Sequence, residues 1–262
     1  MLPGGIVVSH LTWDLIRQRH DIQEQHYVLH VPTPRLNFAD RPRALNDAYA
    51  ELGRIGLARS TNVDPVLLDI MRMLSAPTLE LHGWVSQPRR PMIGVVAAAG
   101  PRGAVLAFKD EKTIHVEPIR ADHLAQSIVR LMPALGPGRG PSVTLPMDVI
   151  KVIEANRTFR EETGGFLERN NGRTQLEKDA DAMVALLKQP RLGGGQIYAG
   201  FRPKLGSRRE SQTPLAYVDA ESGRWLVKDK RGSTGDLWKV ATPATADLMI
   251  SELNHLLADV RG

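Results

Sequence analysis

The eight histidines of this 262-residue chain are the side chains best suited to metal binding or acid–base chemistry. His26 and His30 are separated by three residues, a spacing that binds zinc when both lie on one face of a helix. Residues 27–31, however, have the pattern of a short strand, in which positions four apart lie about 13 Å from each other. We therefore expect no metal site at this pair and no cofactor in the chain. His82 and His115 are expected on the solvent-facing sides of two other strands.

Motifs of the common enzyme classes are missing from the sequence. There is no Gly-x-Ser-x-Gly turn of the hydrolases, and the absence of cysteine excludes thiol nucleophiles, thiolate metal sites and disulfides. The glycines at 193–195 precede a predicted strand, whereas phosphate-binding glycines follow a strand and open a helix. The adjacent acidic residues at 110–111 and 161–162 are typical of solvated turns and helix ends. We predict a binding protein without enzymatic activity.

The distribution of charge limits the classes of partner that the chain is expected to bind. The chain has 34 basic and 29 acidic residues, a net charge of +5, but its basic residues form only short clusters, such as 89–90 and 208–209. Nucleic-acid binding requires a more continuous basic stripe, so a basic nucleic-acid-associated factor is the alternative function rather than the preferred one. A hydrolase built from scattered His and Asp residues is a third hypothesis.

No apolar run approaches the roughly 20 residues of a membrane span, and the first ten residues do not resemble a signal peptide. We expect no membrane insertion and a cytoplasmic location.

Helical spacing of apolar residues, together with proline and aspartate at probable first turns, predicts the helices. They begin near Leu11 and cover 42–56, 64–77, 122–131, 147–160, 174–189 and 243–260. Period-2 patterns and turn signals predict the strands between them. These cover 27–31, 79–85, 92–99, 104–109, 113–117, 196–202, 215–219, 223–228 and 237–241.

The order of these elements repeats within the chain. A four-stranded meander followed by a proline-started helix occurs in the half 1–135 and again in the half 142–262, after a Gly/Pro connector at 136–141. We predict a single α+β domain with a central antiparallel sheet, made of two quasi-repeated meanders flanked by helical bundles and related by a pseudo-twofold axis.

Two exposed aromatic residues and two basic loops are the features that suit a protein interface. Trp84 and Tyr198 are predicted on the more polar faces of their strands, and interface hot spots favour Trp, Tyr and Arg. Packing of each aromatic ring under a covering helix is the structural alternative. The loops 87–91 and 203–213 follow the first strand of each meander and could clasp a partner at one rim. The candidate partner-binding residues are Trp84, Ser86, Gln87, Arg89, Arg90, Gln196, Tyr198 and Arg208.

The order and spacing of several segments resemble the EspG family, the cytosolic chaperones of type VII (ESX) secretion in mycobacteria and related actinobacteria. The segments are LTWDL at 11–15, residues 48–57, DP at 64–65, residues 74–85, RGAVLA at 102–107, VEPI at 116–119, GGGQ at 193–196, PLAYVD at 214–219 and GRWLV at 223–227.

The resemblance implies a chaperone that binds a PE–PPE heterodimer through the apolar tip of the PPE helical bundle. It also implies that the loop between the second and third strands reaches this tip, which is residues 86–91 here if 27–31 is the first strand. A monomer, or a weak homodimer without its substrate, is expected. Replacing Trp84 or Arg90 is expected to weaken substrate binding without unfolding the protein.

Overall fold

The computed structural model describes residues 5–32, 37, 39–151, 175–232 and 235–262. The chain divides into two compact units, and each of them is discontinuous in sequence. Unit 1 comprises Met1–Pro133, Gly195–Pro214 and Ile250–Gly262, and unit 2 comprises Ala134–Gly194 and Leu215–Met249. Among the helices described, none is long and apolar enough to span a bilayer.

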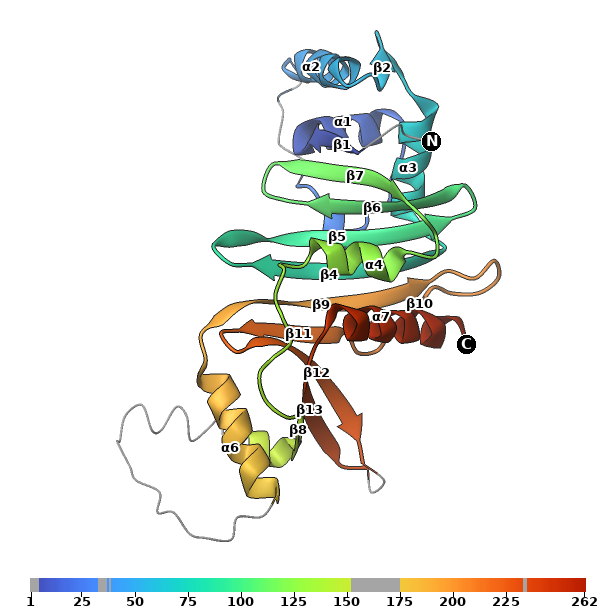
Figure 1. Ribbon diagram of the computed structural model, residues 1–262. Coiled ribbons are helices and arrows are strands. Elements are labelled where there is room, and N and C mark those ends of the chain that lie inside the picture. The colour runs from blue at the N-terminus through green and yellow to red at the C-terminus, as the bar shows by residue number, and fades with distance from the viewer. Residues whose placement is uncertain (1–4, 33–36, 38, 152–174, 233–234) are drawn as a thin grey trace. The chain divides into compact units, whose positions relative to one another are not determined.

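Unit 1 contains a sheet with the strand order β1-β7-β6-β5-β4-β9. Its strands are β1 (Ile6–Ser9), β4 (Leu79–Gln87), β5 (Arg90–Gly100), β6 (Gly103–Lys109), β7 (Thr113–Ile119) and most of β9 (Arg191–Phe201), and the short β10 (Arg209–Glu210) pairs with β9. The pairs β1·β7, β7·β6, β6·β5 and β5·β4 are antiparallel. Figure 1 shows β4 to β7 as an up-and-down meander.

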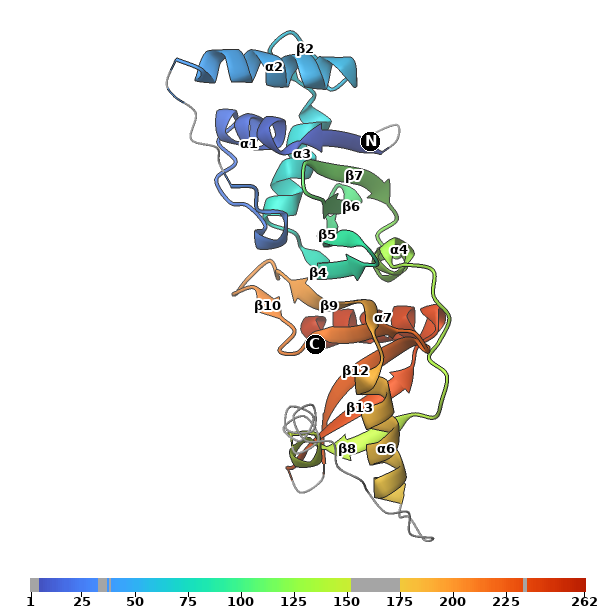
Figure 2. The ribbon, with the colours of Figure 1, turned by 90° about the vertical axis from the view of Figure 1, so that its left-hand side faces the viewer.

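Helices cover both faces of the unit 1 sheet. Figure 2 shows α3 (Pro65–Ser75) and α4 (Leu124–Leu131) on opposite faces, and both helices contact β5. The central strands are therefore buried on both sides: Val96 and Ala98 pack in the cluster that contains α3, and the alternate residues Val95 and Ala97 are equally inaccessible.

Further helices of unit 1 are α1 (His10–Arg19) and α2 (Arg41–Arg54), which contact each other, and most of α7 (Ala246–Arg261). A two-stranded ribbon, β2 (Ala58–Arg59) and β3 (Asn62–Val63), leads into α3. The start of α3 was predictable because Asp64 caps it, accepting the Val66 amide, and Pro65 occupies the first turn.

The strand predicted at 27–31 is wrong. This segment contains a 3₁₀ helix, η1 (Tyr27–Leu29), whose first turn is capped by the His26 side chain. η1 packs onto β5 at Gly94, where an added Cβ would lie 2.6 Å from the Val28 carbonyl oxygen. Val28 and Leu29 are buried by tertiary packing rather than by pairing in a sheet.

Unit 2 contains the strand order β11-β12-β13-β8. Its elements are β8 (Val143–Pro146), α6 (Gln175–Lys188), β11 (Leu215–Ala220), β12 (Gly223–Arg231) and β13 (Leu237–Pro243), and α6 contacts β8. The 136–141 connector is bound to this unit: the Gly138 amide donates to the Arg224 carbonyl at 2.8 Å, and an added Cβ at Gly138 would meet the Trp225 ring at 2.2 Å.

The predicted fold class, α+β with a large antiparallel sheet, is confirmed. In chain order, β4 to β7 precede α4, and β9, β11, β12 and β13 precede α7. The edge strands β1 and β8 were not predicted. Pro118 is the second-last residue of β7 and Pro243 the last residue of β13, so neither opens a helix. Of the helix predicted at 147–160, residues 147–151 are helical and the rest lies outside the described residues.

Candidate partner-binding surface

The β4–β5 hairpin ends in a tight turn that is fully exposed. Gln87 pairs with Arg90, so the loop predicted at 87–91 is reduced to Pro88 and Arg89. Arg89 has φ 56°, in the left-handed region. We define the β4–β5 tip as residues 88–92; all five are exposed, and Met92 has 60% of its surface accessible.

Toward the sheet, the predicted site residues become less accessible. Ser86 and Gln87 are half-buried, and the Gln87 side-chain amide donates to the Leu131 carbonyl at 3.2 Å. Trp84 is also half-buried: it packs against the hydrophobic core of unit 1, with its ring centroid 5.7 Å from that of Tyr27. The face of β4 that carries Trp84, which was expected to be the more polar one, is thus covered by other residues of unit 1.

The other residues on that face of β4 are more deeply buried. Glu80 is 1% exposed and His82 is inaccessible, which corrects the solvent-facing position predicted for His82. His26, at the start of η1, lies beside them with its Nε2 2.9 Å from Glu80 Oε2. We call these three residues the His26–Glu80–His82 cluster. His115, in contrast, is half-buried beside Asp110.

Arg208 closes this cluster from the segment 203–213, which was predicted as a solvated loop. Its Nη2 lies 2.5 Å and its Nε 3.2 Å from Glu80 Oε1, and its Nη1 lies 3.1 Å from Glu210 Oε2. Gly200 leaves the space for this pair, since an added Cβ there would lie 2.5 Å from Glu80 Oε1. Arg208 therefore acts inside unit 1 rather than as a free cation.

Burial and charge set the protonation states in the cluster. Burial opposes ionisation of Glu80, but His26, His82 and Arg208 outweigh it and lower the pKa of the Glu80 carboxyl to about 2. Burial lowers the pKa of His82, although Glu80 and Glu210 act in the opposite direction. Near neutral pH, Glu80 is thus ionised and His82 is neutral.

The two predicted loops do not share one rim. The Arg202 amide, just before the 203–213 segment, donates to the carbonyl of Thr78, which precedes β4, at 2.8 Å, whereas the β4–β5 tip lies at the other end of β4. Gln196 is exposed, and Tyr198 is half-buried with its ring stacked on that of His82 at 5.9 Å between centroids. The exposed apolar residue of the 203–213 segment is Leu205, at 90%.

Comparison with known proteins decides the family. The model of the EspG family matches residues 9–255. The chain belongs to the EspG family. Its structure is similar to that of the Mycobacterium tuberculosis type VII secretion system chaperone EspG5, solved in complex with the PE25–PPE41 dimer. The TM-score is 0.68 at 18% sequence identity, over 98% of this chain and 96% of that one. A comparison with curated protein sequences gives no match.

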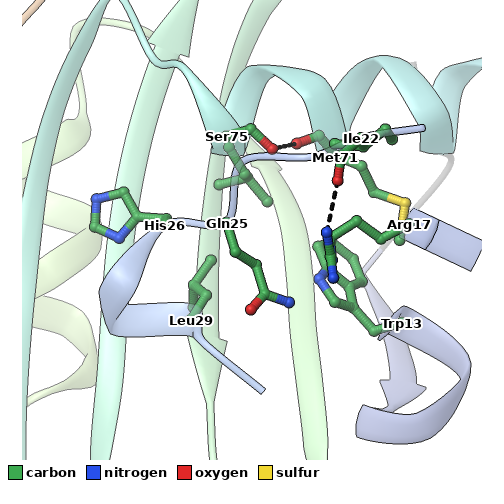
Figure 3. A pocket seen from close by; sticks show the side chains of 9 residues that line it. Trp13, Arg17, Ile22, Gln25, His26, Leu29, Met71 and Ser75 are labelled. Carbon is green, nitrogen blue, oxygen red and sulfur yellow. Dashed lines mark hydrogen bonds between the residues drawn. The ribbon is translucent and has the colours of Figure 1, made fainter. Parts of the chain in front are cut away.

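The described part of unit 1 of this EspG-family protein has at least three hollows, one of which, about 540 Å³, lies between α1 and α2 beside Leu15 and Tyr49. Figure 3 shows a smaller one, between α1, α3 and the segment before η1, with the His26 ring turned away from Trp13 and Arg17. Its volume of about 10 Å³ is that of a single water-sized sphere. Another, about 560 Å³, is an apolar groove between α3 and the β5–β6 turn, bordered by Met73 and Arg102.

The sequence contained one signal for the buried cluster of this EspG-family protein. Glu80 and His82 alternate in an otherwise apolar strand, which places both side chains on one face of β4. The sequence suggested a pair of His26 with His30 and gave no sign that His26 lies beside Glu80 and His82. Only the tertiary fold brings η1 and the 203–213 segment to β4.

Proposed function

We propose that this protein is a type VII secretion chaperone that acts by binding PE–PPE heterodimers in the cytoplasm, not by catalysis. The observation that carries the proposal is the EspG-family match over residues 9–255. The fold it shares with EspG5, which was solved with a PE–PPE dimer, supports it.

The finer part of the proposal is that the protein covers the apolar tip of the PPE helical bundle. An exposed apolar patch of more than a few hundred Å² promotes aggregation. A cap that buries roughly 1,200–2,000 Å² in total forms a stable complex without nucleotide or metal chemistry. Release then depends on competition from other components of the secretion pathway.

The β4–β5 tip is the part of unit 1 that best suits this contact. It brings the exposed residues Arg89, Arg90 and Met92 together on one hairpin. Arginine and apolar side chains that lie together are typical of interface centres. The groove at the opposite end of β5 is the competing location.

The test is co-expression of the chain with PE–PPE pairs from its host, followed by size-exclusion chromatography. A stable complex is expected with a cognate pair. If the chain forms no complex with any of the pairs, the proposed function is overturned. Salt-sensitive retention of nucleic acid would favour the alternative function of a nucleic-acid-associated factor.

A matched pair of variants tests whether the β4–β5 tip is the binding surface. Arg90→Ala combined with Met92→Ala is expected to lower the affinity at least about tenfold, or about 1.4 kcal/mol. Arg102→Ala, which borders the groove, is expected to bind like the wild type. The opposite result would place the interface at the groove.

A further inference from the structure

The His26–Glu80–His82 cluster holds three potential metal ligands, and all three side chains are buried. Each residue offers a ligand atom within 4.8 Å of the other two, and their side chains are 5%, 1% and 0% exposed. Within the described part of the chain, His82 Nδ1 is a buried polar atom without a hydrogen-bond partner, and His26 Nε2 and Glu80 Oε2 have only each other, 2.9 Å apart and outside hydrogen-bond alignment. Such atoms are rare in folded proteins and need an explanation.

The second polar atom of each side chain is already engaged. Glu80 Oε1 accepts from Arg208, and His82 Nε2 lies 2.7 Å from Glu210 Oε1. His26 Nδ1 faces the Val28 amide at 3.3 Å. A carboxylate behind a histidine, as Glu210 is behind His82, is the usual outer contact of a metal-binding imidazole.

Without a cation, His82 Nδ1 faces the Glu80 carboxylate unfavourably. A neutral His82 that donates from Nε2 to Glu210 has a lone pair on Nδ1, which lies 3.7 Å from the Glu80 carboxylate. His26 Nε2 carries the ring proton, because Nδ1 accepts from the Val28 amide, so its contact with Glu80 Oε2 at 2.9 Å is attractive but poorly aligned for a hydrogen bond. Glu80, Glu210 and Arg208 together carry one net negative charge, which favours a cation at this point.

We propose that His26, Glu80 and His82 bind one divalent transition-metal ion, for which Zn²⁺ is the representative. Two imidazoles and one carboxylate suit zinc and its neighbours, whereas magnesium and calcium prefer oxygen ligands alone. Ligand atoms around tetrahedral zinc lie about 3.4 Å apart, so small side-chain shifts bring the three into place. The Val28 amide then turns to another acceptor, because His26 carries its proton on Nδ1 when Nε2 binds metal.

The three ligand side chains are at most 5% exposed, so the bound ion has a structural role, and a fourth ligand beyond these three completes its tetrahedral coordination. The site joins η1 to β4 and, through the Glu210 and Arg208 contacts, fixes the segment around β10. Metal binding here does not depend on the proposed chaperone function, since neither the β4–β5 tip nor the groove supplies a ligand.

The test uses the full chain, stripped of metal with chelator and titrated with ZnCl₂. One Zn²⁺ per chain is expected, with a rise in Tm that chelator reverses. Co²⁺ in place of Zn²⁺ reports tetrahedral coordination through its visible absorption. Absence of saturable binding to the wild-type chain overturns the proposal.

Variants assign the ligands. His82→Gln is expected to weaken Zn²⁺ binding at least about tenfold, and His115→Gln, outside the cluster, to leave it unchanged. Equal binding by both variants would overturn the site. If His82→Gln does not fold, ¹⁵N chemical shifts of the wild-type imidazoles decide: Zn²⁺ is expected to move His82 Nδ1 and His26 Nε2, and shifts confined to other histidines contradict the proposal.

Discussion

Arg224 and Asp219 form a bidentate ion pair across β11 and β12 in unit 2. Arg224 Nε lies 2.7 Å from Asp219 Oδ1, and Nη2 lies 2.8 Å from Oδ2, with both side chains at most 5% exposed. The guanidinium also lies over the Tyr217 ring, 4.9 Å from its centroid. The planar guanidinium is what allows one side chain to make all these contacts.

Arg224→Lys keeps the charge and loses this geometry. We expect the free energy of unfolding to fall by about 2 kcal/mol, the size of one charge-assisted hydrogen bond in a buried site. Urea unfolding measures it. Lys239→Arg, at the more exposed pair with Asp229, is the control and is expected to change stability by less than about 0.5 kcal/mol. Equal effects would show that burial of the pair is unimportant.

Arg208→Met is expected to destabilise unit 1 by leaving the Glu80 carboxylate without its guanidinium partner. Removing one partner of a fully buried pair costs about 3–5 kcal/mol. Because the Arg208 side chain is 28% exposed, water compensates in part and we expect about 2 kcal/mol. Arg209→Met, at its exposed neighbour, should unfold like the wild type in urea. A stable Arg208→Met variant would mean that Glu80 is balanced by other charges.

Local signals predicted the elements that local contacts determine. Asp64 and Pro65 predicted the start of α3, and the turn between Gly100 and Gly103 predicted the β5–β6 hairpin, because caps and turns depend on neighbouring residues. The η1 segment was wrongly predicted as a strand for the opposite reason. A short apolar run fits a strand or a packed turn equally well, and the contact with Gly94 that decides between them is distant in sequence.

The candidate surface was predictable in part. The exposed arginines at 89 and 90 were expected from a basic turn between two strands. The burial of Glu80, His82 and Trp84 was not, because alternation along β4 identifies a second face without showing what covers it. That cover comes from η1 and the 203–213 segment.

Trp84→Ala is therefore expected to act through folding rather than through the interface, which revises the expectation from sequence. Removal of a half-buried indole packed against the core should cost about 2–3 kcal/mol of stability. Arg90→Ala should change stability by less than about 0.5 kcal/mol. Urea unfolding of both variants, beside their affinities for a PE–PPE pair, separates the two effects. Unaltered stability of Trp84→Ala would restore Trp84 as a contact residue.

Acid stability provides a test of the turn before β7. Partial burial disfavours the charged form of Asp110, but the amides of Lys112 and Thr113, the Thr113 hydroxyl and His115 outweigh it and lower the pKa of this carboxyl to about 2. Because the pKa is lower in the folded state than the ordinary 3.8, the stabilisation is complete above pH 3.8 and is lost as the pH falls toward about 2.

Asp110→Asn should remove this part of the pH dependence. The difference in free energy of unfolding between wild type and variant is expected to be constant at higher pH and to shrink as the pH falls from 3.8 toward 2, measured by urea unfolding at a series of pH values. Glu111→Gln, at the exposed neighbouring carboxylate, should give a curve parallel to the wild type. A constant difference for Asp110→Asn down to pH 2 would mean that the turn releases Asp110 before it is protonated.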